Sequence, residues 1–283
     1  MVTFGFRGEA LSSLCAIAEV SIVSRTSEQT MGMHLTFNSD GVLVSQSPVA
    51  RPVGTTVTVR NLFHSLPVRR AEFQRNAKRD YARCVAVLTA YGLISTHVKF
   101  SVSHIAAKGA RSRVISTAGG ANARLRDTII GLFGSRQLAS LLPLDVSVPL
   151  TGGGVAHMSG YVSGPDHGAG RSTSDREFTF VNGRPADLPR LTKAVREAFH
   201  AFNSTQSPFL ALHIQLPPDA LDINVTPDKR TLLLHDDRRL FDALREHVAE
   251  TLGQVAGVAI PSNPPVKSTQ TRLSRSSSTP STD

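Results

Sequence analysis

The sequence contains no tryptophan, only three tyrosines and only two cysteines among its 283 residues. With so few large aromatic side chains, an aromatic stacking platform for single-stranded nucleic acid is not expected. Cys15 and Cys84 lie far apart in the chain, so neither a disulfide framework nor a zinc site is supported. Each cysteine falls on the apolar side of a predicted helix, where a free thiol acts as a small hydrophobic group.

Long apolar runs and acidic residues are also scarce. No run of about 18 apolar residues occurs, and the N-terminus lacks the basic start and apolar core of a signal peptide. These absences predict a soluble, intracellular protein. The 31 Lys and Arg residues exceed the 22 Asp and Glu residues, which gives a net charge of +9. This excess favours a polyanionic partner, although it fits equally well a basic protein with nothing bound.

Helical and strand-like periodicities mix along the whole chain, which predicts an α/β (α+β) fold. Asn122 is expected to cap the helix that Gly134 ends. The predicted helices span 9–18, 69–91, 122–133, 189–202 and 237–253. The predicted strands span 20–26, 33–37, 42–46, 54–60, 98–103, 111–117, 138–148, 155–163, 177–182, 209–215 and 222–225.

Two of these segments carry further detail. The turn between strands 33–37 and 42–46 is a hairpin signature, with Gly41 supplying a positive φ. The long helix over 69–91 is expected to place its apolar side chains on one face. That face comprises Phe73, Ala77, Tyr81, Val85 and Leu88.

The composition divides the chain into three regions. A new unit begins at Gly119-Gly120, so one domain is expected over residues 1–120 and a second over 121–255. Of the last 23 residues, 15 are Ser, Thr or Pro. Such a segment buries too little apolar surface to offset its ordering entropy, so residues 256–283 are predicted to form a disordered linker.

A glycine-flanked motif stands at the start of the chain, directly before the first predicted helix. Glycines let the backbone approach a ligand closely, and a helix N-terminus offers free N–H groups to an anion. A Gly-x-x-Gly turn alone commonly marks only the start of a helix. No strand precedes the motif, so we expect the chain to begin within a domain. The motif reads Gly5-Phe6-Arg7-Gly8-Glu9-Ala10-Leu11.

Three more motifs follow in order. Gly54-Thr55 opens a strand and offers a hydroxyl group, although threonine is also an ordinary strand former. The segment Phe180–Pro185 ends a strand in the turn signal Asn-Gly. The run over 222–230 places Lys229 on a turn stiffened by Pro227, where its ammonium group is able to reach a phosphate. An exposed turn lysine without a ligand is the simpler reading of Lys229 taken alone.

Together these four motifs resemble those of the MutL family of DNA mismatch-repair proteins, in the form of the eukaryotic PMS-type subunit. The resemblance covers most of residues 4–253. Val68 and Glu72 depart from the family pattern, which has alanine and lysine there. The resemblance implies the C-terminal part of a GHKL-type ATPase sandwich up to about residue 120, followed by a ribosomal-S5-like α/β domain.

The resemblance also implies bound ATP and Mg²⁺. The expected nucleotide contacts are Gly5 to Leu11, Thr55 and Lys229, with Lys229 reaching the γ-phosphate. In the family, the water-activating glutamate, the magnesium-holding asparagine and an Asp-x-Gly that reads adenine precede the first motif. This chain has only residues 1–4 there. We therefore expect an N- and C-terminally incomplete family member that does not hydrolyse ATP by itself.

The partners implied by the resemblance are double-stranded DNA, a second MutL homologue in a heterodimer and a MutS-type mismatch-recognition complex, in the nucleus. The predicted DNA contacts are Arg184, Arg190, Lys193 and Arg196. A second basic stripe consists of Arg75, Lys78, Arg79 and Arg83. Each stripe fits a solvated helix face as well as a DNA contact.

Other functions fit parts of the same pattern. A non-catalytic protein that binds DNA or a partner without nucleotide is the principal alternative. A gyrase-like or chaperone-like GHKL ATPase is a second, against which the first motif and the run over 224–229 argue. A fragment without function is a third, and the sequence does not separate it from the first reading.

Overall fold

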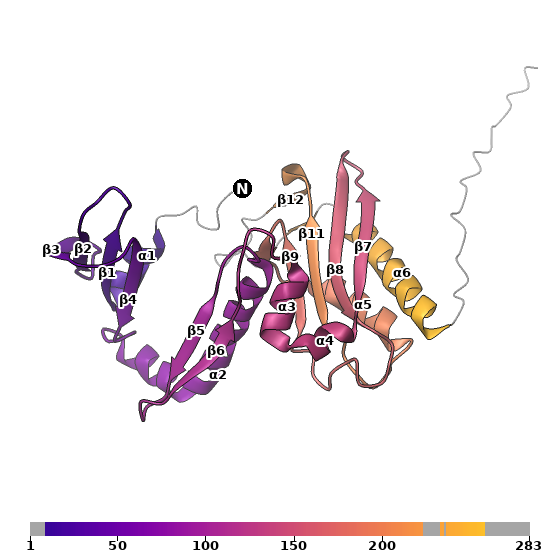
Figure 1. Ribbon diagram of the computed structural model, residues 1–283, viewed down its shortest axis with the longest axis horizontal. Helices are drawn as coiled ribbons and strands as arrows, with labels where there is room; N and C mark the ends of the chain where they lie inside the picture. The colour runs from indigo at the N-terminus through magenta and orange to yellow at the C-terminus, as the bar shows by residue number, and fades with distance from the viewer. Residues whose placement is uncertain (1–8, 223–232, 235, 258–283) are drawn as a thin grey trace, which may run out of the picture.

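A computed structural model describes residues 9–222, 233–234 and 236–257 of the protein (Figure 1). The helices are α1 Glu9–Ile17, α2 Pro67–Ile94, α3 Leu125–Phe133, α4 Ser135–Ala139, α5 Pro189–His200 and α6 Asp237–Ala256. The longer strands are β1 Glu19–Arg25, β2 Gly32–Phe37, β3 Leu43–Val49, β4 Gly54–Arg60, β5 Ser101–Ile105, β6 Arg111–Ser116, β7 Leu141–Pro149, β8 Val155–Ser163, β9 Glu177–Val181 and β11 Leu210–Gln215. Short pairs are formed by β10 Arg184–Pro185, β12 Leu221–Asp222 and β13 Leu233–Leu234.

The mixed architecture agrees with the sequence prediction. The N-terminal sheet has the strand order β3-β2-β1-β4 and is antiparallel throughout. The predicted hairpin joins β2 to β3, and Gly41 adopts a φ of 78° in its turn. Among the described residues of these four strands, Val20 is the one fully buried apolar side chain. This sheet is therefore covered far less than the C-terminal one.

Helix α2 leads from the N-terminal sheet to the rest of the protein (Figure 1). Pro67 stands at its first position, where a missing N–H costs nothing. The first half of the predicted apolar face is not buried, since Phe73 and Tyr81 are exposed. Only the last turns are buried, at Ala90 and Leu93. Helical spacing fixes which side chains share a face, but another element must cover that face before it is buried.

The antiparallel hairpin of β5 and β6 lies alongside α2 (Figure 1). Phe100 and Ile115 at its open end approach Gly92, near the end of the helix. The rings of His104 and Tyr81 are 4.7 Å apart, further back along α2. The open end of the hairpin therefore lies beside the end of α2, and its turn points toward the first half of α2.

The C-terminal sheet has the order β10-β9-β11-β8-β7, in which β9 and β11 are parallel and the other neighbours antiparallel. Helices α5 and α6 cover one face through a core that includes Leu191, Leu212 and Leu244. On the other face, a second cluster joins Phe209 to α3 and to Leu93 of α2. The end of α2 therefore packs into the core of the region predicted as the second domain.

Several local predictions are wrong for identifiable reasons. Helix α3 begins at Leu125 rather than after Asn122, because the Arg124 N–H donates to the Asp127 carboxylate at 2.8 Å and starts the helix there. The first residues of the predicted strand 138–148 belong to α4, so β7 begins only at Leu141.

The side chains of the two cysteines have different environments. Cys15 is buried, as expected of a thiol on an apolar face. Cys84 is exposed, contrary to the prediction that it lies on an apolar side of its helix. No described helix is long and apolar enough to cross a membrane.

Candidate nucleotide and DNA sites

The predicted phosphate loop is described only at its end. Glu9, Ala10 and Leu11 form the exposed first turn of α1. The preceding residues Gly5, Phe6, Arg7 and Gly8 lie outside the described residues, and so does Lys229. The assignment of these residues to a nucleotide site therefore stays a prediction.

Thr55, the remaining predicted nucleotide contact, lies near the start of β4. Its hydroxyl oxygen is 2.7 Å from the Ser24 hydroxyl, with which it shares a hydrogen bond across to β1. Along the same strand, Val57 and Val59 are exposed at alternate positions. Because side chains alternate along a strand, Thr55 shares a sheet face with these valines.

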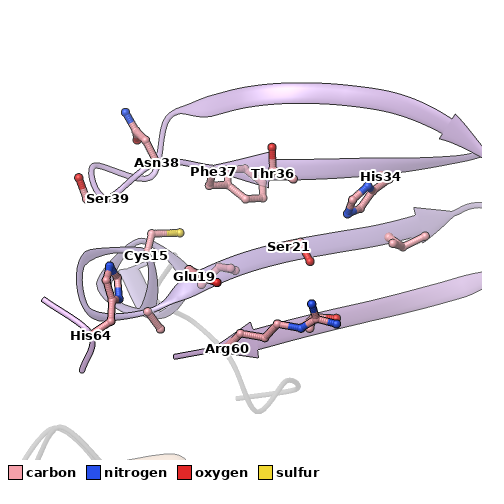
Figure 2. A pocket seen from close by; sticks show the side chains of 14 residues that line it. Cys15, Glu19, Ser21, His34, Thr36, Phe37, Asn38, Ser39, Arg60 and His64 are labelled. Carbon is pink, nitrogen blue, oxygen red and sulfur yellow. The ribbon is translucent and has the colours of Figure 1, made fainter. Parts of the chain in front are cut away.

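A cavity of about 630 Å³ lies on the other face of the same sheet, beside the end of α1 (Figure 2). Its lining includes Ser21, Thr36 and Thr58, which pair across β2, β1 and β4 in a row of hydroxyl groups. Arg60 and His34 also line it. Strand alternation directs Thr55 away from this cavity, so Thr55 and the cavity lie on opposite faces of the sheet.

Metal ligands are not gathered in the part of the chain that the structure describes. There, no group of three or more His, Cys, Asp or Glu side chains is arranged to hold a metal ion.

The predicted DNA contacts on α5 have acidic partners. Arg196 donates two hydrogen bonds to the Glu177 carboxylate, at 3.1 and 2.7 Å. The Glu177 side chain is only 9% exposed. These hydrogen bonds and the negative charge of Glu177 raise the pKa of Arg196. The pair joins α5 to β9.

Arg190 and Lys193 are paired as well. Arg190 donates to the Asp237 carboxylate at the start of α6, and its guanidinium group lies 5.7 Å from the centre of the Phe241 ring. Lys193 lies 3.7 Å from Glu197 in an exposed pair one helical turn away. The three cations of α5 therefore each face a carboxylate, and two of them fasten α5 to neighbouring elements.

The turn that carries Arg184 is held by two side chains from the strand region. The Asn182 amide donates to the Leu216 carbonyl at 3.0 Å and accepts from the Leu216 N–H at 2.8 Å. The Gly183 N–H donates to His213 Nε2 at 2.9 Å. Burial and the neighbouring His157 lower the pKa of His213. The Asn-Gly pair indicated a turn, but nothing local in the sequence pointed to His213.

The second basic stripe lies on the uncovered first half of α2. Arg75, Lys78, Arg79 and Arg83 are all exposed. Arg79 and Arg83 both approach Asp80, at 3.7 and 3.9 Å. Arg75 and Lys78 form no ion pair with a described residue. The structure thus separates the two predicted stripes by their degree of charge pairing.

Comparison with known proteins defines the family of this chain. Residues 129–253 match the family model of the DNA mismatch repair protein C-terminal domain. The chain is 41% identical to mismatch repair endonuclease PMS2 of Gallus gallus over 265 residues, covering 89% of this chain and 30% of that protein. It is 40% identical to DNA mismatch repair protein PMS1 of Arabidopsis thaliana, covering 88% of this chain and 26% of that protein. It spans about 30% of the length of these curated relatives.

Solved structures agree. The N-terminal domain of a DNA repair protein superposes with a TM-score of 0.83 at 36% identity, covering 89% of this chain and 77% of that one. The Aquifex aeolicus MutL ATPase domain complexed with ADP superposes with a TM-score of 0.57 at 20% identity, covering 86% and 77%. The fold is thus that of a MutL-type, GHKL-like ATPase domain region. The chain belongs to the MutL family of DNA mismatch-repair proteins, and its relatives near 40% identity are of the PMS type.

Proposed function

We propose that this chain is the nucleotide- and DNA-binding part of a PMS-type mismatch-repair protein. It binds ATP with Mg²⁺ and double-stranded DNA, pairs with a second MutL homologue and acts with a MutS-type complex in the nucleus. The observation that carries this proposal is the 36% identity and TM-score of 0.83 with the N-terminal domain of a DNA repair protein. The family order of the four motifs supports it.

The described residues fit a nucleotide in part. The exposed first turn of α1 has backbone N–H groups without helical partners, which suit a phosphate. Thr55 adds a hydroxyl group from β4. When bound, ATP would supply the phosphate charges that Arg7 and Lys229 neutralise. These residues bind and orient, and none of them is a general base for water attack.

Nucleotide binding is tested with a fluorescent, non-hydrolysable ATP analogue and Mg²⁺. We expect saturable binding that weakens at least tenfold in Lys229→Ala, because a charge-assisted contact to phosphate is lost. Lys193→Ala, which removes an equal charge on α5, should bind the analogue like the wild type. Equal binding by wild type and Lys229→Ala would refute the assigned role of Lys229.

ATP turnover is a separate measurement. We expect the isolated chain to release no phosphate above the background, because the nucleotide contacts assigned here bind and orient phosphate and none is assigned as a general base. Turnover by the wild type that Lys229→Ala abolishes would contradict this expectation.

A second candidate function is binding of DNA or a partner without any role for nucleotide. The observation that favours it is the well-covered C-terminal sheet, whose core includes fully buried Leu191, Leu212 and Leu244. Salt-sensitive DNA binding that is unchanged by the ATP analogue would support this candidate over the first.

A further inference from the structure

The basic character of this protein is concentrated in a single segment. Residues 60–126 hold 13 of the 31 Lys and Arg residues but only two of the 22 Asp and Glu residues. The surplus of 11 positive charges exceeds the +9 of the whole chain, so the remaining residues together carry a net charge of −2. Attraction to a polyanion therefore originates in this segment, which contains α2 and the β5–β6 hairpin.

Much of this charge is exposed on one structural unit, which we call the basic ridge. It consists of the exposed cations of α2 and of the hairpin packed along it (Figure 1). Its members are Arg69, Arg70, Arg75, Lys78, Arg79, Arg83, Lys108, Arg111 and Arg113. Because the hairpin turn points toward the first half of α2, Lys108 and Arg111 extend the same region.

The ridge is largely without charge compensation. Within the described residues, Asp80 is the one carboxylate that lies within 4 Å of a ridge cation, and Arg79 and Arg83 share it. On α5, by contrast, Arg190, Lys193 and Arg196 each have a carboxylate of their own. The pairing matters most for Arg196, whose partner Glu177 is largely buried, and least for the exposed pair of Lys193 and Glu197.

We infer that the backbone of double-stranded DNA binds along the basic ridge. The inference rests on the proposed function for the presence of DNA, and it names the surface. Cations from Arg69 to Arg83 extend over about 21 Å of helix, at 1.5 Å per residue. That length matches about six base pairs of a duplex.

The chemistry of the ridge favours a duplex over other polyanions. Five of the six cations on α2 are arginines, whose planar guanidinium groups match phosphate oxygens in pairs. The aromatic side chains nearby are engaged: Tyr81 contacts His104, and Phe73 lies 5.8 Å from Phe63. The ridge therefore offers many cations for a backbone, whereas its two exposed aromatic rings each already contact another ring.

The test is fluorescence anisotropy of a labelled 20-base-pair duplex at several salt concentrations, with the full chain and three triple variants. The ridge variant is Arg75→Ala, Lys78→Ala and Arg79→Ala. The α5 variant is Arg190→Ala, Lys193→Ala and Arg196→Ala. The charge-matched control on α6 is Arg238→Ala, Arg239→Ala and Arg245→Ala. Circular dichroism melts establish that each variant is folded before binding is compared.

We expect the ridge variant to lose affinity by about tenfold or more near 0.1 M salt, because phosphate neutralisation drives this kind of binding. The slope of log K against log salt should fall in magnitude by about 2 to 3. The α6 control should lose much less. Loss in the α5 variant with retention in the ridge variant would overturn the inference while leaving the proposed DNA function intact.

Three other outcomes also overturn the inference. Equal losses in the ridge variant and the α6 control would show that net charge, and not the ridge, determines binding. Tighter binding of poly-L-glutamate than of the duplex at equal charge concentration would identify an acidic protein as the partner. No salt-sensitive duplex binding by the wild type would remove both the inference and the proposed DNA function.

Discussion

The two larger sheets of this protein have four and five strands, yet they are buried to very different extents. In the C-terminal sheet, helices cover both faces, and strand residues such as Leu212 and Ala211 on opposite faces are fully buried. In the N-terminal sheet, valines on β3 and β4 remain exposed, including Val57 at 46%. An apolar strand pattern thus gives a stable core only where a second layer packs on it.

Truncation of a buried side chain should show the largest difference in stability between the two sheets. Phe209 is fully buried and packs its ring against Phe133 at 5.3 Å between centroids. Phe209→Ala should lower the free energy of unfolding by about 3–5 kcal/mol, through lost burial and a cavity. Val57→Ala should cost less than about 1 kcal/mol, because the valine is half exposed. Urea unfolding measures both, and equal losses would show that the two sheets are equally covered.

The next largest loss of stability is expected at Gly160, where the backbones of β8 and β11 lie in close contact. A Cβ atom at Gly160 would lie 2.0 Å from the Ala211 carbonyl oxygen, so the strands would have to move apart. We expect Gly160→Ala to destabilise the protein by about 1–3 kcal/mol. A Cβ atom at Gly152 would have no neighbouring atom within 4 Å, so Gly152→Ala is the matched control. Its free energy of unfolding should change by no more than about 0.5 kcal/mol. Similar melting temperatures for the two variants would contradict the packing.

The paired cations of α5 allow a smaller but sharper test. Arg196→Ala leaves the largely buried Glu177 carboxylate without its partner, which should cost about 1–3 kcal/mol. Lys193→Ala removes only an exposed pair and should cost at most about 0.5 kcal/mol. Chemical unfolding of both variants separates a structural cation from a solvated one. The reverse order would contradict the structural role assigned to the pair of Arg196 and Glu177.

The smallest expected effect is a pH dependence at the Asn182–Gly183 turn. Burial, followed by the charge of His157, lowers the pKa of His213, so folding favours its neutral ring. Its stabilisation is therefore present above the unfolded pKa and is lost as the pH falls through the folded one. Between pH 7.5 and pH 5 the melting temperature of the wild type should fall further than that of His213→Gln, whose side chain does not titrate. An equal fall in melting temperature in both proteins would refute the role assigned to His213.

The sequence predicted the elements well where local signals decide them. The strand over 54–60 has the predicted bounds, and the hairpin turn at 38–41 follows from a glycine that tolerates positive φ. Prediction failed where several local solutions compete. Asn122 is a good capping residue, but the hydrogen bond between Arg124 and Asp127 starts the helix two residues later. Gly5 to Gly8 and Lys229 lie outside the described residues, so their assignment as nucleotide contacts stays a prediction.

The sequence by itself determined the family, the alternation of helices and strands and the position of the basic segment. These properties depend on residues close together in the chain, or on the order of motifs. Only the tertiary structure decided which cations are compensated. Arg190 pairs with Asp237, 47 residues away, and Arg196 pairs with Glu177 on another element. Charge pairing depends on distance in space, so basic stripes that look alike in the sequence differ in their charge compensation once the chain has folded.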